Sequence, residues 1–360
     1  MKKLSYFHLL LGLIFFLLQG SLIAEPIEIK PIETKHQQGT FIGAKDAQHP
    51  NWFKDSFLDI EDDIADATDA GKRLVVYFWQ PGCPYCSQLW EDNFSQQKIE
   101  SDFRKHFEIV ALNMWGDREI VSVGGNDYSK KSFANALHIA YTPTLLFFNE
   151  NKKVVHKMQG YIPPEDFQLA MSYVSGKHDK QMKFGEFIAS RAKETKEKTV
   201  GKLHDESFYS TTTIFDRRSE SDKNNYLAVY FEKPNCKNCD LLHEKTLQDK
   251  TTQALAKQFT AVQLNRYADT KITLPNGNNS TILAWANELG IGYLPAMVFF
   301  NKKGEEVMRI DTQMRTFHVQ SVFDYVLSGA YKTEKNFQRY ISDRSEKIRE
   351  SGKNVDISIY

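Results

Sequence analysis

The residues of this chain with the most evident chemistry are its four cysteines, which form two Cys-x-x-Cys pairs. Cys83 and Cys86 follow the β-branched and aromatic run Leu74–Trp79 and a Pro-Gly turn. Such a run predicts a buried strand, and the Ser-Gln-Leu-Trp-Glu sequence behind Cys86 predicts a helix. The first pair is therefore predicted to lie where a strand is followed by the N-terminus of a helix.

That position favours a reactive thiol at Cys83. The free N–H groups and the positive end of the helix dipole stabilise a thiolate more than a thiol. Cys86, inside the helix, is placed to attack a mixed disulfide formed on Cys83. The pattern predicts thiol–disulfide exchange, with Cys83 as the nucleophile and Cys86 as the resolving thiol.

The same arrangement recurs at Cys236 and Cys239, behind the apolar run 226–231. We predict that Cys236 is the nucleophile of this second site and Cys239 its resolving thiol. Lys237 favours a thiolate at Cys236, whereas Glu232 opposes it. The alternative is that this second copy only binds partners.

Two structural explanations compete with redox chemistry at these cysteines. A Cys-x-x-Cys bridge closes a very short loop, so it contributes little stability through loop entropy. A zinc site would need both pairs to converge, although each pair has its own strand and helix. We therefore predict no metal and no organic cofactor.

Length and charge narrow the class of protein. A chain of 360 residues indicates about two domains. Lys plus Arg and Asp plus Glu are equal, at 46 each. No arginine-rich or aromatic-interleaved basic stripe is visible, so we predict no nucleic-acid partner.

The N-terminal segment is typical of a bacterial secretory signal peptide. Lys2 and Lys3 precede an apolar run, and a cleavage site is predicted after Ala24. We expect residues 1–24 to be removed and the mature protein to lie in the periplasm, where disulfides persist. An uncleaved membrane anchor is the alternative, although the apolar run is short for a span of about 20 residues.

The chain is a tandem repeat of one unit. Cys236 follows Cys83 by 153 residues, and Pro295 follows Pro143 by 152 residues. Phe337 follows Phe184 by 153 residues, so the charged segment after each unit belongs to the repeat. We predict an extended arm at 25–50, a first domain at 51–200 and a second domain at 201–360, each domain with a C-terminal charged helix.

The order of elements is predicted most clearly in the first unit. Apolar residues at helical spacing, among them Phe53 and Phe57, predict a helix over 52–70. The remaining predictions are strands at 74–79, 107–113 and 145–148, a strand beginning at 154, a hairpin or loop within 116–132, and helices at 96–106, at 131–138, after 160–164 and within 177–202.

This order resembles the thioredoxin fold, an α/β fold in which a mixed central sheet carries helices on both faces. The resemblance implies two tandem thioredoxin-like domains. In that family a cis-proline loop faces the dithiol, and Thr142-Pro143 and Leu294-Pro295 occupy its place. Trp79, four residues before the first cysteine, matches a tryptophan of thioredoxins.

The first half is most similar to SoxW-type periplasmic thioredoxins. The resemblance covers roughly residues 52–195, and the second half matches more loosely. The motifs that carry it are Gly116-Asp117-Arg118-Glu119, Tyr141-Thr-Pro-Thr-Leu-Leu-Phe-Phe148 and Gly160-Tyr-Ile-Pro-Pro164.

The resemblance implies a thiol:disulfide oxidoreductase that acts on disulfide-bearing proteins. The two proline loops would receive a partner's backbone as an added strand. Contacts to the partner are expected from Trp79, Pro84 and Tyr85. The implied role is a protein disulfide reductase recharged by a membrane thiol transporter. An oxidase or isomerase of the same fold, and a partner-binding assembly factor with idle cysteines, remain alternatives.

One departure from thioredoxin concerns the proton. Thioredoxin carries a buried aspartate six residues before its first cysteine, and here that position holds Tyr77 and Tyr230. A tyrosine with a pKa near 10 is a poor proton shuttle. We assign no role to His138 or His243, because a lone histidine is usually a surface or helix-end residue.

Overall fold

The computed structural model describes residues 37–194, 201–218 and 225–360. The predicted signal peptide and the first part of the predicted arm, residues 25–36, lie outside these ranges. Residues 37–360 form one structural unit that contains both repeats. In the part of the chain described, no helix is both long and apolar enough to cross a membrane.

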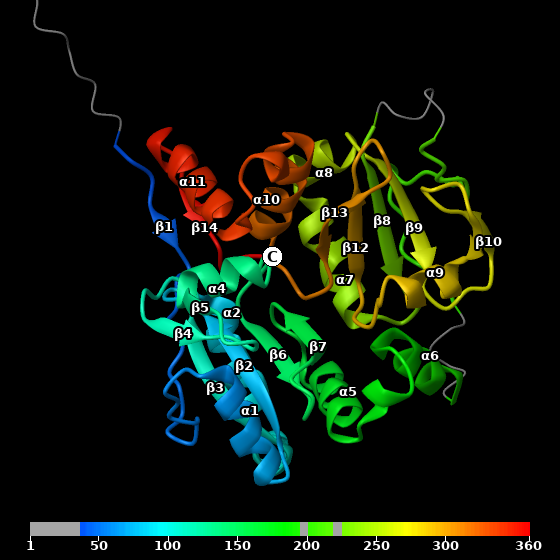
Figure 1. Ribbon diagram of the computed structural model, residues 1–360. Coiled ribbons are helices and arrows are strands. Elements are labelled where there is room, and N and C mark those ends of the chain that lie inside the picture. Colours follow the sequence, from blue (N-terminus) through cyan, green and yellow to red (C-terminus); the bar gives the residue numbers. More distant parts are fainter. Residues whose placement is uncertain (1–36, 195–200, 219–224) are drawn as a thin grey trace, which may run out of the picture. The chain divides into compact units, whose positions relative to one another are not determined.

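The first repeat is built on a four-stranded mixed sheet of order β3-β2-β6-β7 (Figure 1). The central strand β2 pairs parallel to β3 and antiparallel to β6, which pairs antiparallel to β7. The strands are β2 (Arg73–Trp79), β3 (Phe107–Asn113), β6 (Thr144–Phe148) and β7 (Val154–Gln159). All four strands are at the predicted places.

Helices cover both faces of this sheet because side chains alternate along each strand. Val75 and Tyr77 of β2 join one apolar cluster, and Val76 and Phe78 join another on the opposite face. The first cluster packs against α3, α5 and α6, and the second against α1 and α4. The helices are α1 (Ile60–Asp69), α2 (Pro84–Gln88), the π-helical η1 (Leu89–Phe94), α3 (Gln97–His106), α4 (Lys130–Ala136), α5 (Pro164–Ser175), the 3-10 turn η2 (His178–Lys180) and α6 (Phe184–Glu194).

The second repeat has the same topology, with a sheet of order β9-β8-β12-β13. Its strands are β8 (Leu227–Glu232), β9 (Thr260–Asn265), β12 (Ala296–Phe300) and β13 (Glu306–Ile310). Its helices are α7 (Lys237–Glu244), η5 (Thr246–Gln248), α8 (Lys250–Ala256), α9 (Ile282–Glu288), α10 (Thr316–Leu327), η6 (Ala330–Lys332) and α11 (Phe337–Glu350). The prediction of a tandem α/β fold is confirmed.

A short hairpin follows the second strand of each sheet. In the first repeat it pairs β4 (Glu119–Val121) with β5 (Asp127–Ser129), as the hairpin prediction for this segment required. In the second repeat β10 (Lys271–Thr273) pairs with β11 (Asn279–Thr281).

The prediction of a helix over 52–70 is wrong at its N-terminal end. The helix begins only at Ile60, after Asp59 accepts hydrogen bonds from the backbone N–H groups of Glu61 and Asp62. Asp59 is a preferred N-cap residue because its carboxylate satisfies these free donors. Phe57, which the periodicity placed on a buried face, is 98 % exposed.

The two repeats pack against each other with a reciprocal set of contacts. Tyr141 lies in the apolar cluster of the second repeat and donates its hydroxyl to the carbonyl oxygen of Arg309 at 2.7 Å. Its counterpart Tyr293 lies in a cluster of the first repeat, with its hydroxyl 2.7 Å from Nε2 of His156. Arg309 and His156 are also equivalent, 153 residues apart. Such reciprocity is the pattern of an isologous two-fold interface, here formed within one chain.

The charged helices predicted at the end of each repeat complete this interface. Helix α6 packs beside α9 of the second repeat, and the Phe184 ring lies 5.1 Å from the Tyr293 ring. In the same way, the Phe337 ring of α11 lies 5.5 Å from the Tyr141 ring. The apolar stripe of each helix is therefore buried against the other repeat as well as its own.

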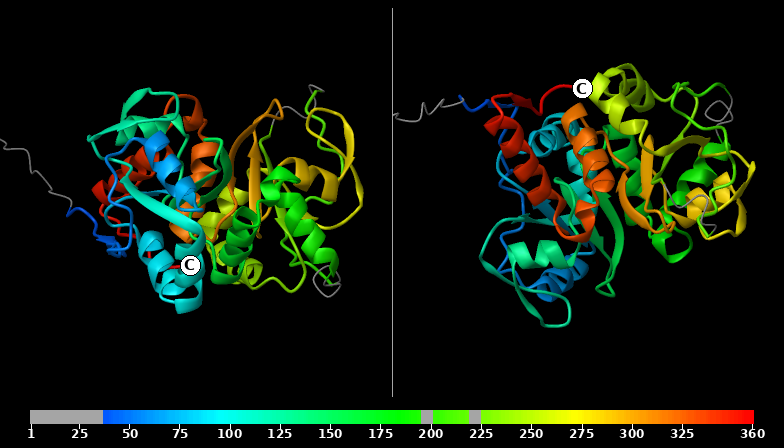
Figure 2. Two further views of the ribbon diagram at one scale, coloured as in Figure 1. Left: turned by 60° about the horizontal axis from the view of Figure 1, so that its bottom comes forward. Right: turned by 90° about the horizontal axis from the view of Figure 1, so that it is seen from above.

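The described part of the predicted arm pairs with the C-terminal strand of the chain. Strand β1 (Phe41–Ile42) pairs parallel with β14 (Val355–Asp356), and both views show the two segments side by side (Figures 1 and 2). Further along the arm, Asp46 accepts a hydrogen bond from the backbone N–H of Gly82 at 2.6 Å. The arm thereby contacts the turn that precedes Cys83.

Candidate active sites

The first cysteine pair lies where the sequence predicted it, at the junction of β2 and α2. Cys83 has extended backbone geometry and caps the helix, with its Sγ accepting a hydrogen bond from the Cys86 N–H at 3.1 Å. The two residues are joined by a disulfide. Cys83 is 3 % exposed and Cys86 is fully buried. Cys83 is thus the outer sulfur of the pair, as expected for the attacking thiol.

The predicted proline loop faces this disulfide. The Thr142–Pro143 peptide bond is cis, as predicted. The Thr142 hydroxyl donates to Sγ of Cys83 at 3.3 Å, and the Thr142 carbonyl oxygen lies 3.5 Å from the same sulfur. The fold therefore brings the dithiol and the loop into contact from positions that are 59 residues apart.

The second site repeats this geometry. Cys236 caps α7, and its Sγ accepts from the Cys239 N–H at 3.2 Å within a second disulfide. The Leu294–Pro295 bond is also cis, as predicted, and Leu294 lies in the same apolar cluster as both cysteines. Lys237 beside Cys236 is exposed, whereas its counterpart Pro84 is buried.

The tyrosines that replace the thioredoxin aspartate are held neutral. Tyr77 and Tyr230 are fully buried. Burial raises the pKa of each phenol well above its ordinary value. This agrees with the expectation that neither tyrosine serves as a proton shuttle.

The residues under the two dithiol helices differ in chemistry. In the first repeat, Trp79 is half-buried and packs against the cluster that contains both cysteines. The His49 ring lies between two tryptophans, with its centroid 4.6 Å from that of Trp79 and 6.2 Å from that of Trp90. Because Trp79 is engaged in this aromatic packing, it also helps to hold the arm on the site.

The equivalent positions in the second repeat hold a buried charged pair. Glu232 and His243 stand 153 residues after Trp79 and Trp90. Nε2 of His243 lies 2.9 Å from Oε1 of Glu232, and its Nδ1 lies 2.9 Å from Oε1 of Glu206. His243 lies in the last turn of α7, in agreement with a helix-end residue, but it is buried and paired rather than at the surface.

Charge partners decide the protonation of His243. Its side chain is 1 % exposed and that of Glu232 is fully buried. Burial alone would lower the pKa of His243. The hydrogen bonds and charges of Glu232 and Glu206 raise the pKa by more than burial lowers it, so the net shift is upward. A lone histidine in the sequence gives no signal of this pair. A comparison of the two repeats does give a signal, because the two tryptophans of the first repeat are replaced by one acidic and one basic residue in the second.

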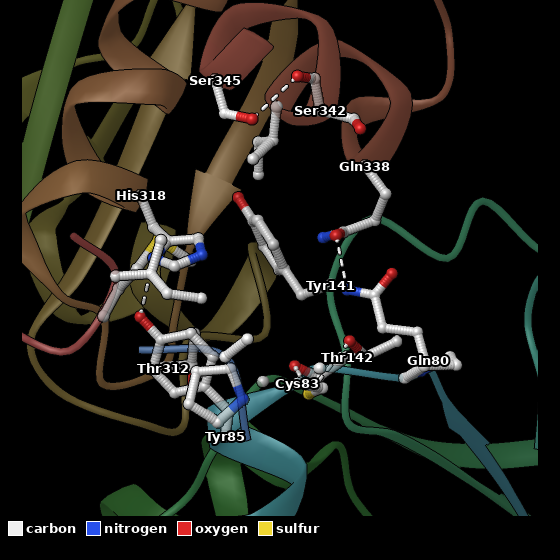
Figure 3. Close-up of a pocket in the computed structure, with 18 of the residues that line it drawn as sticks. Gln80, Cys83, Tyr85, Tyr141, Thr142, Thr312, His318, Gln338, Ser342 and Ser345 are labelled. Atoms are coloured by element: carbon white, nitrogen blue, oxygen red, sulfur yellow. Dashed lines mark hydrogen bonds between the residues drawn. The ribbon is translucent and has the colours of Figure 1, made fainter. Parts of the chain in front are cut away.

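A cavity of about 270 Å³ lies in front of Cys83 (Figure 3). The first repeat contributes Gln80, Cys83, Tyr85, Tyr141 and Thr142 to its walls. The opposite wall comes from the second repeat, through the segment 312–314, His318 of α10, and Gln338, Ile341, Ser342 and Ser345 of α11. Figure 3 shows the Gln338 side chain directed toward Gln80 and the His318 ring directed toward Tyr85.

Tyr85, predicted to contact a partner, is bound by the second repeat instead. Its hydroxyl oxygen accepts from the Arg315 backbone N–H at 2.9 Å and lies 3.1 Å from Nδ1 of His318. Tyr85 and Pro84 are both buried. A partner group reaches these residues only through the cavity.

The residues of the second repeat that line this cavity were missed from the sequence. Thr312, His318 and Gln338 lie more than 200 residues from Cys83 and carry no motif. Only the packing of the two repeats reveals their role.

Within the described ranges, no group of three or more His, Cys, Asp or Glu side chains is arranged to hold a metal ion. The two cysteine pairs belong to separate apolar clusters.

Similarity to known proteins is found in both repeats. The model of the thioredoxin-like domain matches residues 60–175 and again 218–327. Among solved structures, a thioredoxin-fold protein from Helicobacter pylori is 19 % identical, with 40 % of this chain and 88 % of that chain covered and a TM-score of 0.32. A thioredoxin from Thermus thermophilus is 17 % identical, with 38 % and 87 % covered and a TM-score of 0.26. No curated protein matches the chain.

Proposed function

The chain belongs to the thioredoxin-like domain family, and we propose on that basis that it reduces disulfides of other proteins in the periplasm. It is a thiol–disulfide oxidoreductase, because each repeat carries a Cys-x-x-Cys pair at the start of a helix. The observation that carries the proposal is the contact between Thr142 of the cis-proline loop and Sγ of Cys83. The proline loop is thereby beside the outer sulfur, where we expect the disulfide under attack to bind.

The reaction requires two exchanges at one site. The Cys83 thiolate attacks a partner disulfide, which forms a mixed disulfide and releases one partner sulfur as a thiolate. The Cys86 thiolate then attacks Sγ of Cys83, forms the intramolecular disulfide and releases the second partner sulfur. The partner gains two electrons and, with two protons, becomes a dithiol. Cys236 and Cys239 perform the same steps in the second repeat.

Features of the sequence support the proposed direction and compartment. The signal-peptide-like residues 1–24 favour a periplasmic location. The similarity of the first half to SoxW-type thioredoxins favours reduction. A dithiol donor then has to return each disulfide to the reduced form, and a membrane thiol transporter is the donor that this family resemblance implies.

The test is reduction of insulin disulfides by the protein from Glu25 onward, with dithiothreitol as the donor. We expect turnover above the dithiothreitol background, and its loss in the double variant Cys83→Ser/Cys236→Ser. Each single variant assigns the share of one site. A redox titration of each pair separates a reductant from an oxidant. Absence of wild-type turnover would support the partner-binding alternative and overturn the proposal.

A further inference from the structure

The cavity in front of Cys83 is bordered by three parts of the chain and opens to solvent at its rim, where Phe41 and Ser342 are exposed. The first repeat forms its base, and Thr312 of the second repeat donates its hydroxyl to the Tyr161 carbonyl oxygen at 2.6 Å. The backbone N–H of Gln313 also donates to this carbonyl oxygen, at 3.3 Å. The arm adds Phe41 and Ala44 to the lining. Chain from the second repeat therefore lies where a protein partner would approach.

Polar contacts fix the relative position of these walls. Nε2 of Gln80 donates to Oε1 of Gln338 at 2.8 Å, and Nε2 of Gln338 donates to the Ala140 carbonyl oxygen at 2.9 Å. Nε1 of Trp115 donates to Oε1 of Gln80 at 2.8 Å. This chain of amide hydrogen bonds crosses the boundary between the repeats, so the second repeat is bound directly to the rim of the first site.

The cavity lining carries no formal charge. Among the residues described, none of those that line it is Asp, Glu, Lys or Arg. Its one titratable imidazole is neutral, because burial and the nearby Arg315 lower the pKa of His318 to about 3. The Tyr85 hydroxyl oxygen accepts from the Arg315 N–H at 2.9 Å and lies 3.1 Å from Nδ1 of His318, so both polar groups of this wall have partners. A charged ligand would find no counter-ion on these walls.

The size of the cavity limits the part of a ligand that can lie inside it. Its volume of about 270 Å³ is less than that of most pockets for drug-sized ligands, which run from about 300 to 1,000 Å³. An engineered cavity of about 150 Å³ holds one benzene molecule. On the same scale, the space in front of Cys83 holds roughly ten non-hydrogen atoms, which a small disulfide fills completely.

We propose that the first dithiol exchanges with small, uncharged disulfides, and that residues of the second repeat select them. The inference rests on the proposed exchange function and assigns the substrate class of its first site. Protein disulfides are then left to the second site, where Asn235 and Lys237 beside Cys236 are exposed. Gln338 and Ser342 of α11 act as specificity residues for a dithiol in the other repeat.

The proposed reaction is a balanced two-electron exchange. The Cys83 thiolate forms an S–S bond to one sulfur of the small disulfide, and the other sulfur leaves with the bonding electrons and takes up a proton. Attack by Cys86 on Sγ of Cys83 releases the second half as a thiol. One turnover thus converts the protein dithiol to a disulfide and the ligand to two thiols. A dithiol donor is needed only for further turnovers.

A matched pair of disulfides tests the charge requirement. Bis(2-hydroxyethyl) disulfide and cystamine have the same number of heavy atoms, but cystamine carries two ammonium groups in place of two hydroxyls. The reduced full chain is mixed with each in excess, quenched with acid and analysed by mass spectrometry. The Cys236→Ser/Cys239→Ser variant isolates the first site, and Cys83→Ser/Cys86→Ser isolates the second. The rate at which each protein dithiol reacts with a disulfide is divided by the rate at which free dithiothreitol reacts with the same disulfide.

At the first site we expect the neutral disulfide to react at least tenfold faster than cystamine after this normalisation, because an unpaired charge is costly to desolvate. Dithiodiglycolate, an anionic probe, should be disfavoured to a similar extent at the first site but not at the second, where Lys237 is exposed. Insulin should react at least tenfold more slowly than the neutral disulfide at the first site.

A variant of the cavity supplies the control. Ser342 is exposed and lines the cavity, so Ser342→Asp should raise the relative rate of cystamine at the first site severalfold and leave the second site unchanged. Thr333→Asp, on an exposed position of the second repeat outside the lining, should change neither site. Similar normalised rates for all disulfides at the first site would overturn this inference and leave the exchange function intact. A first site that reduces none of them overturns both.

Discussion

Removal of one charge from the Glu232–His243 pair should lower the free energy of unfolding more than removal of any other charge in the second repeat. Both side chains are buried, and Glu232 also accepts from Nε2 of Gln263 at 3.0 Å. Replacing His243 by leucine leaves the Glu232 carboxylate buried without its cationic partner. Breaking a buried ion pair in this way costs about 3–5 kcal/mol. We expect a loss of that size in the free energy of unfolding of His243→Leu.

Removal of both partners should cost less than removal of one. In Glu232→Leu/His243→Leu no charge is left at the centre of the pair, and buried ion pairs replaced by apolar residues are often neutral or stabilising. The first repeat supports this expectation, because the same two positions hold Trp79 and Trp90 there. We therefore expect the double variant to be more stable than His243→Leu alone.

The cost of His243→Leu should also depend on pH. The folded-state pKa of His243 is raised above its ordinary 6.5. The stability from its protonated form is therefore complete below about pH 6.5 and is lost as pH rises through the raised folded-state pKa. The difference between wild type and His243→Leu should shrink as pH rises above about 6.5.

Urea unfolding of the oxidised full chain, followed by far-ultraviolet circular dichroism, measures these differences. Asn238→Ala, a half-buried position on the same helix, is the control for a change in α7 that leaves the pair intact. A double variant that loses the sum of the two single losses, or a cost of His243→Leu that does not change with pH, would refute the buried-pair argument.

Two further variants test a close contact between the repeats and a buried ion pair within the first repeat. Gly160→Ala should lower the unfolding free energy by about 2 kcal/mol or more, because φ is +85° and a Cβ would lie 2.5 Å from Oγ1 of Thr312. In a Thr312→Ala background the same change should cost less, and an equal cost in both backgrounds would contradict the proposed clash. Asp179→Asn should cost about 1–3 kcal/mol in urea unfolding, because Nη1 of the buried Arg73 bonds Oδ1 of Asp179 at 2.6 Å. A stability unchanged within error would show that Arg73 is satisfied by Glu150 and the backbone.

The internal order of each repeat was determined by local sequence. Strands with β-branched and aromatic residues, the Cys-x-x-Cys helices and the two cis-prolines were all predicted, since each depends on residues within a few positions along the chain. The duplication was also evident in the sequence, because landmarks such as Cys83 and Cys236 recur at an almost constant spacing. The start of the first helix was missed because periodicity extends through Phe57, whereas the Asp59 cap decides where the helix begins.

The environment of each dithiol was decided by tertiary packing. Tyr141 and Tyr293 each enter the apolar cluster of the other repeat, and this crossing brings α11 to the site of Cys83. No periodicity or spacing within one repeat encodes such a contact, because the burial that stabilises it arises only when two distant surfaces meet. The same reason explains why His243, which looks isolated in the sequence, is held between two carboxylates in the fold.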